Sequence, residues 1–123
     1  MTKEYLQGYF RCGSFIKSIN EEIHEVSVLK EVIKRYVNHE EVAYILDARE
    51  RKLNKLLKVQ EAKKAEIEAA VQAIPDERIR KLIFLRYIKG LTWEKLSYEM
   101  LYAESHCMAL HAKFFKLEEG ESK

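Results

Sequence analysis

Basic side chains are concentrated between residues 78 and 95 of this 123-residue chain, where they could contact nucleic-acid phosphates. An arginine or lysine beside a phosphate releases condensed counterions, so it adds affinity without reading the sequence. Ordinary surface charge is the alternative interpretation, because charged exteriors are common on helices. The residues that we predict to contact phosphate are Arg78, Arg80, Lys81, Arg86, Lys89, Thr92 and Lys95.

A second set of polar residues lies on the predicted last helix of the chain. Cys107, Leu110, Phe114 and Leu117 recur at steps of three and four, which predicts the buried side of this helix. The candidates for contacts to base edges on its other side are Ser105, His106, Ala109, Lys113 and Lys116. The strongest base readers, arginine, lysine, asparagine and glutamine, are not central on this face. Two alternatives therefore stay open: this face reads DNA, or it receives another helix.

Other kinds of chemistry have little support in the sequence. Cys107 and His111 are four residues apart and could share a metal ion, but no second pair of ligands accompanies them. Paired carboxylates such as Glu21 and Glu22 fall on a long exposed element, and no nucleophile has a base at a suitable spacing. We therefore expect no catalytic residue, no metal site and no cofactor, and we do not expect an enzyme.

Three short helices are predicted between Pro75 and Leu117, and they would position both sets of polar residues. Pro75 suits a first helical position, and the first helix is expected to end at Gly90. Thr92 is predicted to cap a second helix, and residues 101–103 form the turn before the third. We expect the last two helices to pack on the first through Ile79, Ile83, Trp93, Leu96, Leu110 and Phe114. Helix, three-residue turn and helix is the arrangement of a helix-turn-helix motif.

The stretch from Leu85 to Met100, LRYIKGLTWEKLSYEM, resembles region 4 of bacterial sigma factors. It is still more similar to phage-encoded regulators built on that module, the ArpU/RinA-like late-gene activators, in which long N-terminal helices precede a similar motif. The resemblance covers about the last third of the chain. His106, Leu110 and His111 keep the pattern of those relatives. Leu101 stands where their turn usually has glycine, and Ser105 and Ala109 stand where they carry arginine.

Composition favours an all-α protein. The chain has one proline and four glycines against 34% charged and 47% hydrophobic residues, which suits long helices. Its net charge of +2 is only weak support for a nucleic-acid partner. The two cysteines are far apart and have no metal-ligand spacing, which is typical of a reducing compartment. With no signal peptide or membrane-spanning run visible, we expect a cytoplasmic protein without a membrane contact.

Two long helices are predicted before the motif, near residues 4–36 and 40–73. In the first, an apolar seam recurs at steps of three and four, at Tyr5, Tyr9, Cys12, Ile16, Ile19, Ile23, Val26, Leu29, Ile33 and Tyr36. The second has a frame of Leu46, Arg49, Leu53, Leu56, Gln60, Lys63, Ile67, Ala70 and Ile74. A break is expected at residues 38–41, with Asn38 as a helix cap. The two helices could pair as a hairpin or between chains.

These features divide the chain into a coiled-coil arm, residues 1–74, and a helix-turn-helix domain, residues 75–123. The resemblance implies a DNA-binding transcriptional regulator of phage or prophage type, whose partners are double-stranded promoter DNA and RNA polymerase. The long helices favour a homodimer. Two alternatives remain: a helix-turn-helix that now binds a protein, and a small terminase-like subunit for DNA packaging.

Overall fold

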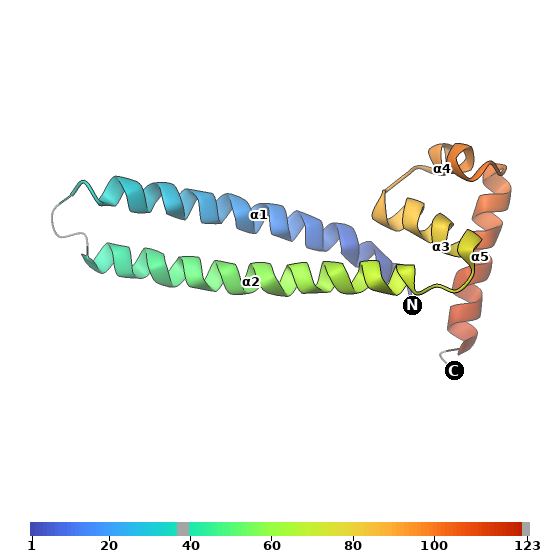
Figure 1. Cartoon of the computed structure of the whole chain (residues 1–123), viewed down its shortest axis with the longest axis horizontal. Coiled ribbons are helices and arrows are strands. Elements are labelled where there is room, and N and C mark those ends of the chain that lie inside the picture. The colour runs from blue at the N-terminus through green and yellow to red at the C-terminus, as the bar shows by residue number, and fades with distance from the viewer. Residues whose placement is uncertain (37–39, 122–123) are drawn as a thin grey trace. The chain divides into compact units, whose positions relative to one another are not determined.

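The protein is all-α. The structure, a computed structural model, describes residues 1–36 and 40–121, with side chains described through Glu118, and this part of the chain contains no strand. Its elements are α1 (Lys3–Ile33), α2 (Glu40–Gln72), α3 (Glu77–Ile83), a π-helical turn (Phe84–Ile88), α4 (Trp93–Met100) and α5 (Glu104–Glu121) (Figure 1). None of the helices in the described ranges has both the length and the apolar character needed to cross a membrane.

The chain forms two compact units that divide inside the two long helices. One unit is residues 12–63, which we call the hairpin unit. The other combines residues 1–11 with residues 64–123, and we call it the C-terminal unit. The units therefore do not separate at residue 74, where the sequence suggested a boundary. The physical reason is that the core of the C-terminal unit includes Leu6 from α1 and Ile67 and Val71 from α2.

In the hairpin unit, α1 and α2 lie side by side and run antiparallel (Figure 1). Charged side chains join them at two levels: Lys30 lies 2.6 Å from Asp47, and Arg49 lies 2.6 Å from Glu22. As the residue number rises in α1 it falls in α2, which identifies a hairpin within one chain. The predicted cap Asn38 lies outside the described residues, and α2 begins at Glu40.

The seam of this hairpin differs from the predicted frames at alternate positions. In α1 the step after Val26 leads to the half-buried Lys30, and Leu29 is exposed, so the predicted seam position of Leu29 is wrong. In α2 the frame is displaced by one residue at every second position. The inner positions of α2 are Glu50 and Leu57 in the hairpin unit and Lys64 and Val71 in the C-terminal unit, whereas the prediction used Arg49, Leu56, Lys63 and Ala70. Long side chains explain the error, because Lys30 and Lys64 can line a seam with their aliphatic stems.

A larger core holds the C-terminal unit together. Leu82, Ile83, Leu96 and Cys107 are fully buried, and Phe114 joins them in the same apolar cluster. Ile79, Trp93 and Leu110 are partly buried against this cluster, which confirms the predicted packing of the last helices on the first.

The start of α3 differs from the sequence-based expectation. Pro75 precedes the helix, and Asp76 is its N-cap, with a carboxylate that accepts hydrogen bonds from the N–H groups of Arg78 and Ile79. Asp76 is the N-cap because its carboxylate accepts hydrogen bonds from two N–H groups of the first turn, whereas proline has no side-chain acceptor.

The helical segment ends before Gly90, as predicted, but its last turn is the π turn Phe84–Ile88, which the sequence did not indicate. Gly90 follows with a φ of 71°, which suits glycine, and a Cβ at this position would lie 2.9 Å from the ring of Phe10. A π turn rotates the residues after it relative to an α-helix, so it changes which side chains face the core.

Candidate nucleic-acid interface

Helices α4 and α5 are joined by a turn of three residues, as predicted. The hydroxyl of Thr92 accepts a hydrogen bond from the N–H of Lys95 at 3.3 Å and caps α4. Leu101 ends this helix in the left-handed conformation, with φ 61° and ψ 35°, and the N–H of Tyr102 donates to the carbonyl of Ser97. Helix α5 then starts at Glu104. The left-handed residue reverses the chain, which is usually the role of glycine.

The inner side of α5 is formed by Cys107, His111, Phe114 and Phe115, which are all buried. Leu117 is 60% exposed, so its predicted place in the buried stripe is wrong. Phe115 takes that place because it lies four residues after His111, which itself lies four residues after Cys107. Leu117 instead lines an open groove of about 320 Å³ with Ile79, Lys113 and Phe114.

The outer side of α5 is free of core contacts along the described helix. The five predicted base-contacting residues, Ser105, His106, Ala109, Lys113 and Lys116, are all exposed. The ring of His106 stacks on Tyr102, with a centroid distance of 4.6 Å and an interplanar angle of 17°. This contact orients the imidazole at the start of α5. The face is neutral near Ser105 and Ala109 and becomes basic at Lys113 and Lys116.

The predicted phosphate contacts fall into two groups. Arg78, Lys81, Lys89, Thr92 and Lys95 are exposed. Arg80 and Arg86 are half-buried and have partners inside the chain. Arg80 donates to the carbonyl of Ile74 at 3.0 Å, and Arg86 donates to the carbonyl of Leu91 at 2.8 Å. Arg86 also lies over the ring of Trp93, 4.5 Å from its centroid, so it joins the π turn to α4.

A hollow of about 220 Å³ lies beside the turn between α4 and α5, and Tyr102 forms part of its wall. Arg78 and Lys81 of α3 line it, together with Glu77 and Met100. Lys81 also donates to the carbonyl of Glu99, near the end of α4. Two cations of α3 therefore lie beside the turn that precedes α5.

His111 has a structural environment that the sequence did not reveal. Its Nε2 lies 2.6 Å from the hydroxyl of Tyr87, and its ring contacts Trp93 and Phe115 edge to face. Burial, together with the nearby charges of Lys3 and Arg86, lowers the pKa of His111 to about 4. Burial raises the pKa of Tyr87. A neutral imidazole and a neutral phenol therefore share this hydrogen bond. The pair depends on the π turn, for which the sequence holds no clear signal.

Metal and thiol chemistry have no built site among the described residues. No three histidine, cysteine, aspartate or glutamate side chains come together there in a way that could hold a metal ion. Cys107 is fully buried, and burial, with a smaller effect of Glu104, raises the pKa of its thiol. A raised pKa disfavours the reactive thiolate.

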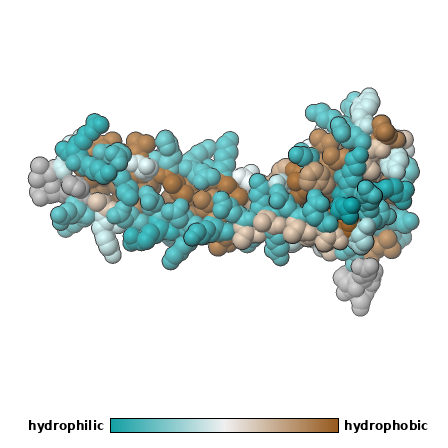
Figure 2. Space-filling view, viewed as in Figure 1, coloured by the Kyte–Doolittle hydropathy of each residue, from teal (hydrophilic) through white to brown (hydrophobic). Residues whose placement is uncertain are grey.

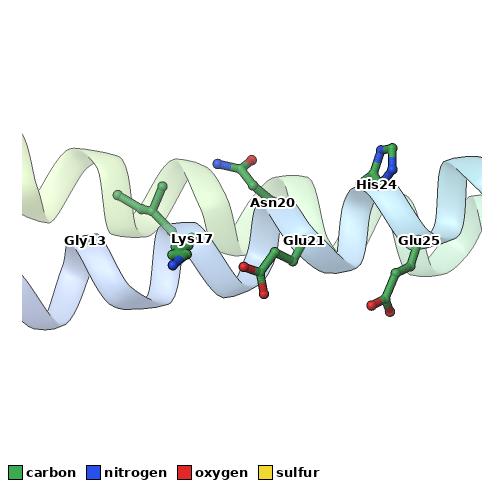
Figure 3. A pocket seen from close by; sticks show the side chains of 7 residues that line it. Gly13, Lys17, Asn20, Glu21, His24 and Glu25 are labelled. Atoms are coloured by element: carbon green, nitrogen blue, oxygen red, sulfur yellow. The ribbon is translucent and has the colours of Figure 1, made fainter.

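The hairpin unit has an open hollow of about 660 Å³ on one flank of α1 (Figure 3). Its walls come from that helix alone, and they include Gly13, Lys17, Asn20 and His24. Asn20 and His24 point to one side of α1, whereas Glu21 and Glu25 point to the other (Figure 3). A hollow built from one helix has no opposing wall, so it does not enclose a ligand.

Comparisons with protein-family models, with curated proteins and with solved structures gave no match for this chain.

Proposed function

We propose that this chain is a DNA-binding transcriptional regulator of phage or prophage type, in which α4, the turn and α5 form a helix-turn-helix. One observation carries the proposal: the outer side of α5 is exposed from Ser105 to Lys116 and has no role in the core of its own unit. A helix held by its inner face next to a tight turn can enter a major groove with its outer face. In this proposal the protein is cytoplasmic, and RNA polymerase is its second partner.

The charges near α5 support the same assignment. Arg78 and Lys81 lie beside the turn, and Lys95 lies in the first turn of α4. Cations that flank a recognition helix bind phosphates and set its position on the duplex. We assign phosphate contact to Arg78, Lys81, Lys89 and Lys95. Arg80 and Arg86 instead stabilise the fold, because both guanidinium groups already donate to carbonyls of the chain.

A second candidate is a helix-turn-helix that binds a protein. The first half of the outer face of α5 supports it, because Ser105, Ala109 and Ala112 are small, exposed and uncharged. A neutral surface of small residues can accept another helix. This candidate shares the fold with the first one and differs in its partner. Neither candidate includes an enzymatic step or a cofactor.

DNA titrations at two salt concentrations test the proposal. Alanine at Lys95 should weaken binding to all sequences alike and lower the slope of log affinity against log salt by about one unit. Lys17, an exposed lysine of the hairpin unit, is the matched control, and its replacement should leave the slope unchanged. Binding that is absent at low salt would exclude DNA as the partner.

The double variant Ser105→Arg and Ala109→Arg separates the two candidates. If α5 lies in a groove, two added cations on its outer face should strengthen DNA binding. An unchanged DNA affinity with loss of a protein complex would favour the second candidate.

A further inference from the structure

The exposed apolar residues of the hairpin unit lie mainly on one side of it. In α1 the positions 15, 18, 22, 25, 29 and 32 alternate in steps of three and four, and in α2 the positions 42, 45, 49, 52, 56 and 59 do the same. This is the spacing of a helix face. We name this surface the second stripe. Its exposed apolar residues are Phe15, Leu29, Val32, Val42, Ile45, Leu56 and Val59.

The ion pair between Glu22 and Arg49 shows that both halves of the second stripe face the same side of the hairpin. Both residues belong to the stripe, and their charged atoms are 2.6 Å apart. The ion pairs Glu22–Arg49 and Lys30–Asp47 together set the level of the two antiparallel helices. They place Phe15 near Leu56 and Val59 in one direction, and Leu29 near Val42 and Ile45 in the other. The second stripe therefore has a charged zone in the middle of its length and an apolar zone at each end.

The opposite flank of the hairpin has a different character. Lys17, Asn20 and His24 lie there, and Asn20 and His24 point away from the side of Glu25, which belongs to the second stripe (Figure 3). Hydrophobic residues are visible along the hairpin between hydrophilic ones (Figure 2). The exposed apolar residues of the second stripe, next to this polar flank, are typical of a surface that a partner covers.

We propose that the second stripe is a dimer interface that takes a second copy of this chain. The two copies would be related by a twofold axis that runs along the hairpin, between the two facing surfaces. This proposal deepens the dimer expected of the long helices, and it does not depend on DNA binding. The result is a four-helix bundle in which each hairpin keeps its own seam.

Charge complementarity selects this axis. The charged zone is acidic on α1, at Glu22 and Glu25, and basic on α2, at Arg49 and Lys52. A twofold axis along the hairpin places α1 of one copy over α2 of the other at the same level. Acidic residues then meet basic residues, and each apolar end meets the same apolar end of the partner. An axis across the hairpin would instead place α1 over α1, with acid against acid.

The size of the surface is sufficient for a stable dimer. Residues 12–33 of α1 rise about 33 Å, and two neighbouring helices are about 20 Å wide. The face therefore covers on the order of 650 Å² on each copy, close to the lower range of specific protein interfaces.

Valine-to-glutamate variants in α1 provide a matched test. Val32 belongs to the second stripe and is 41% exposed, whereas Val28 lies off it and is 47% exposed. In sedimentation experiments without DNA, Val32→Glu should raise the dimer dissociation constant at least about tenfold, because it buries two carboxylates without partners. Val28→Glu should leave the constant unchanged. Equal effects of the two variants, or a monomeric unsubstituted chain, would overturn the proposal.

Cross-linking tests the direction of the axis. Leu29 lies beside the seam, so the two copies of Leu29→Cys should face each other and react with a short bis-maleimide. The unsubstituted chain is the control, because its two cysteines, Cys12 and Cys107, are buried. Val28→Cys is the second control. A dimer in which Leu29→Cys does not cross-link more than Val28→Cys would overturn this arrangement. Loss of DNA binding with an intact dimer would affect only the proposed function.

Discussion

The two compact units bury their apolar residues by different means. Only Cys12, Val26 and Leu53 are buried among the described hydrophobic residues of the hairpin unit, and many others on its helices are exposed. The C-terminal unit surrounds one cluster with segments from α1, α2, α3, α4 and α5. Two helices alone share one seam, so any second apolar stripe stays in water until a partner covers it. The C-terminal unit therefore buries its apolar residues in its own cluster, whereas the hairpin unit can bury more of them only by association.

The largest effect is expected from the core of the C-terminal unit. Phe114→Ala should lower the free energy of unfolding by about 3–5 kcal/mol, because it removes a buried ring from the centre of the cluster. Leu117→Ala, three residues away on the same helix, is the control, and it should cost less than about 0.5 kcal/mol because Leu117 is exposed. Denaturant unfolding measures both. Similar losses for the two variants would show that the cluster does not dominate this unit.

A smaller effect should depend on pH and be specific to the C-terminal unit. The pKa of His111 is about 4 in the folded chain, below the ordinary value of 6.5. The unfolded chain therefore takes up a proton first as the pH falls, and stability should decrease by about 2–3 kcal/mol between pH 6.5 and pH 4. His111→Gln should remove most of this dependence.

The hairpin unit provides the contrast for this measurement. In this unit the hydrogen bond from Lys30 lowers the pKa of Asp47 below its ordinary value of 3.8. The stabilisation from this ion pair should therefore persist as the pH falls to about 3.8, and it should be lost only at lower pH. Unfolding followed separately by Trp93 fluorescence and by total helicity would distinguish the units. A pH dependence that is identical in His111→Gln and in the unsubstituted chain would contradict the buried neutral imidazole.

The smallest effect concerns the turn before α5. Leu101 has a φ of 61°, which is an unfavourable backbone conformation for leucine. Its side chain is 88% exposed, so no burial of that side chain offsets the cost. Leu101→Gly should stabilise the chain by roughly 0.5–1 kcal/mol. Tyr98→Gly, inside α4, should instead destabilise it by roughly 1 kcal/mol. Thermal unfolding of both variants measures the difference, and a destabilised Leu101→Gly chain would contradict the strain at this turn.

The sequence predicted the order and type of the elements well. Alternating steps of three and four residues predicted both long helices, and Thr92 and residues 101–103 marked the cap and the turn that the structure shows. Such signals are local, so they can be identified without the fold.

Residues whose role depends on tertiary contacts were harder to predict. Lys30 occupies a seam position because Asp47 and Glu50 neutralise it from the other helix. Phe115 replaces Leu117 on the inner side of α5, and Arg86 turns toward Trp93 after a π turn. Each of these placements depends on a partner that is distant in sequence or on a backbone form without a sequence signature. The assignment of the outer side of α5 to DNA remains a prediction.

The division of the chain into two units has a consequence for the order of folding. The hairpin unit is continuous in sequence, and its ion pair between Lys30 and Asp47 closes a short loop, which costs little chain entropy. The cluster of the C-terminal unit joins Leu6 to Phe114, so it requires segments from both ends of the described chain. During synthesis the ribosome releases residues 12–63 long before Phe114. The hairpin can therefore form first, and it brings residues 1–11 of α1 beside residues 64–72 of α2 before the last helix arrives.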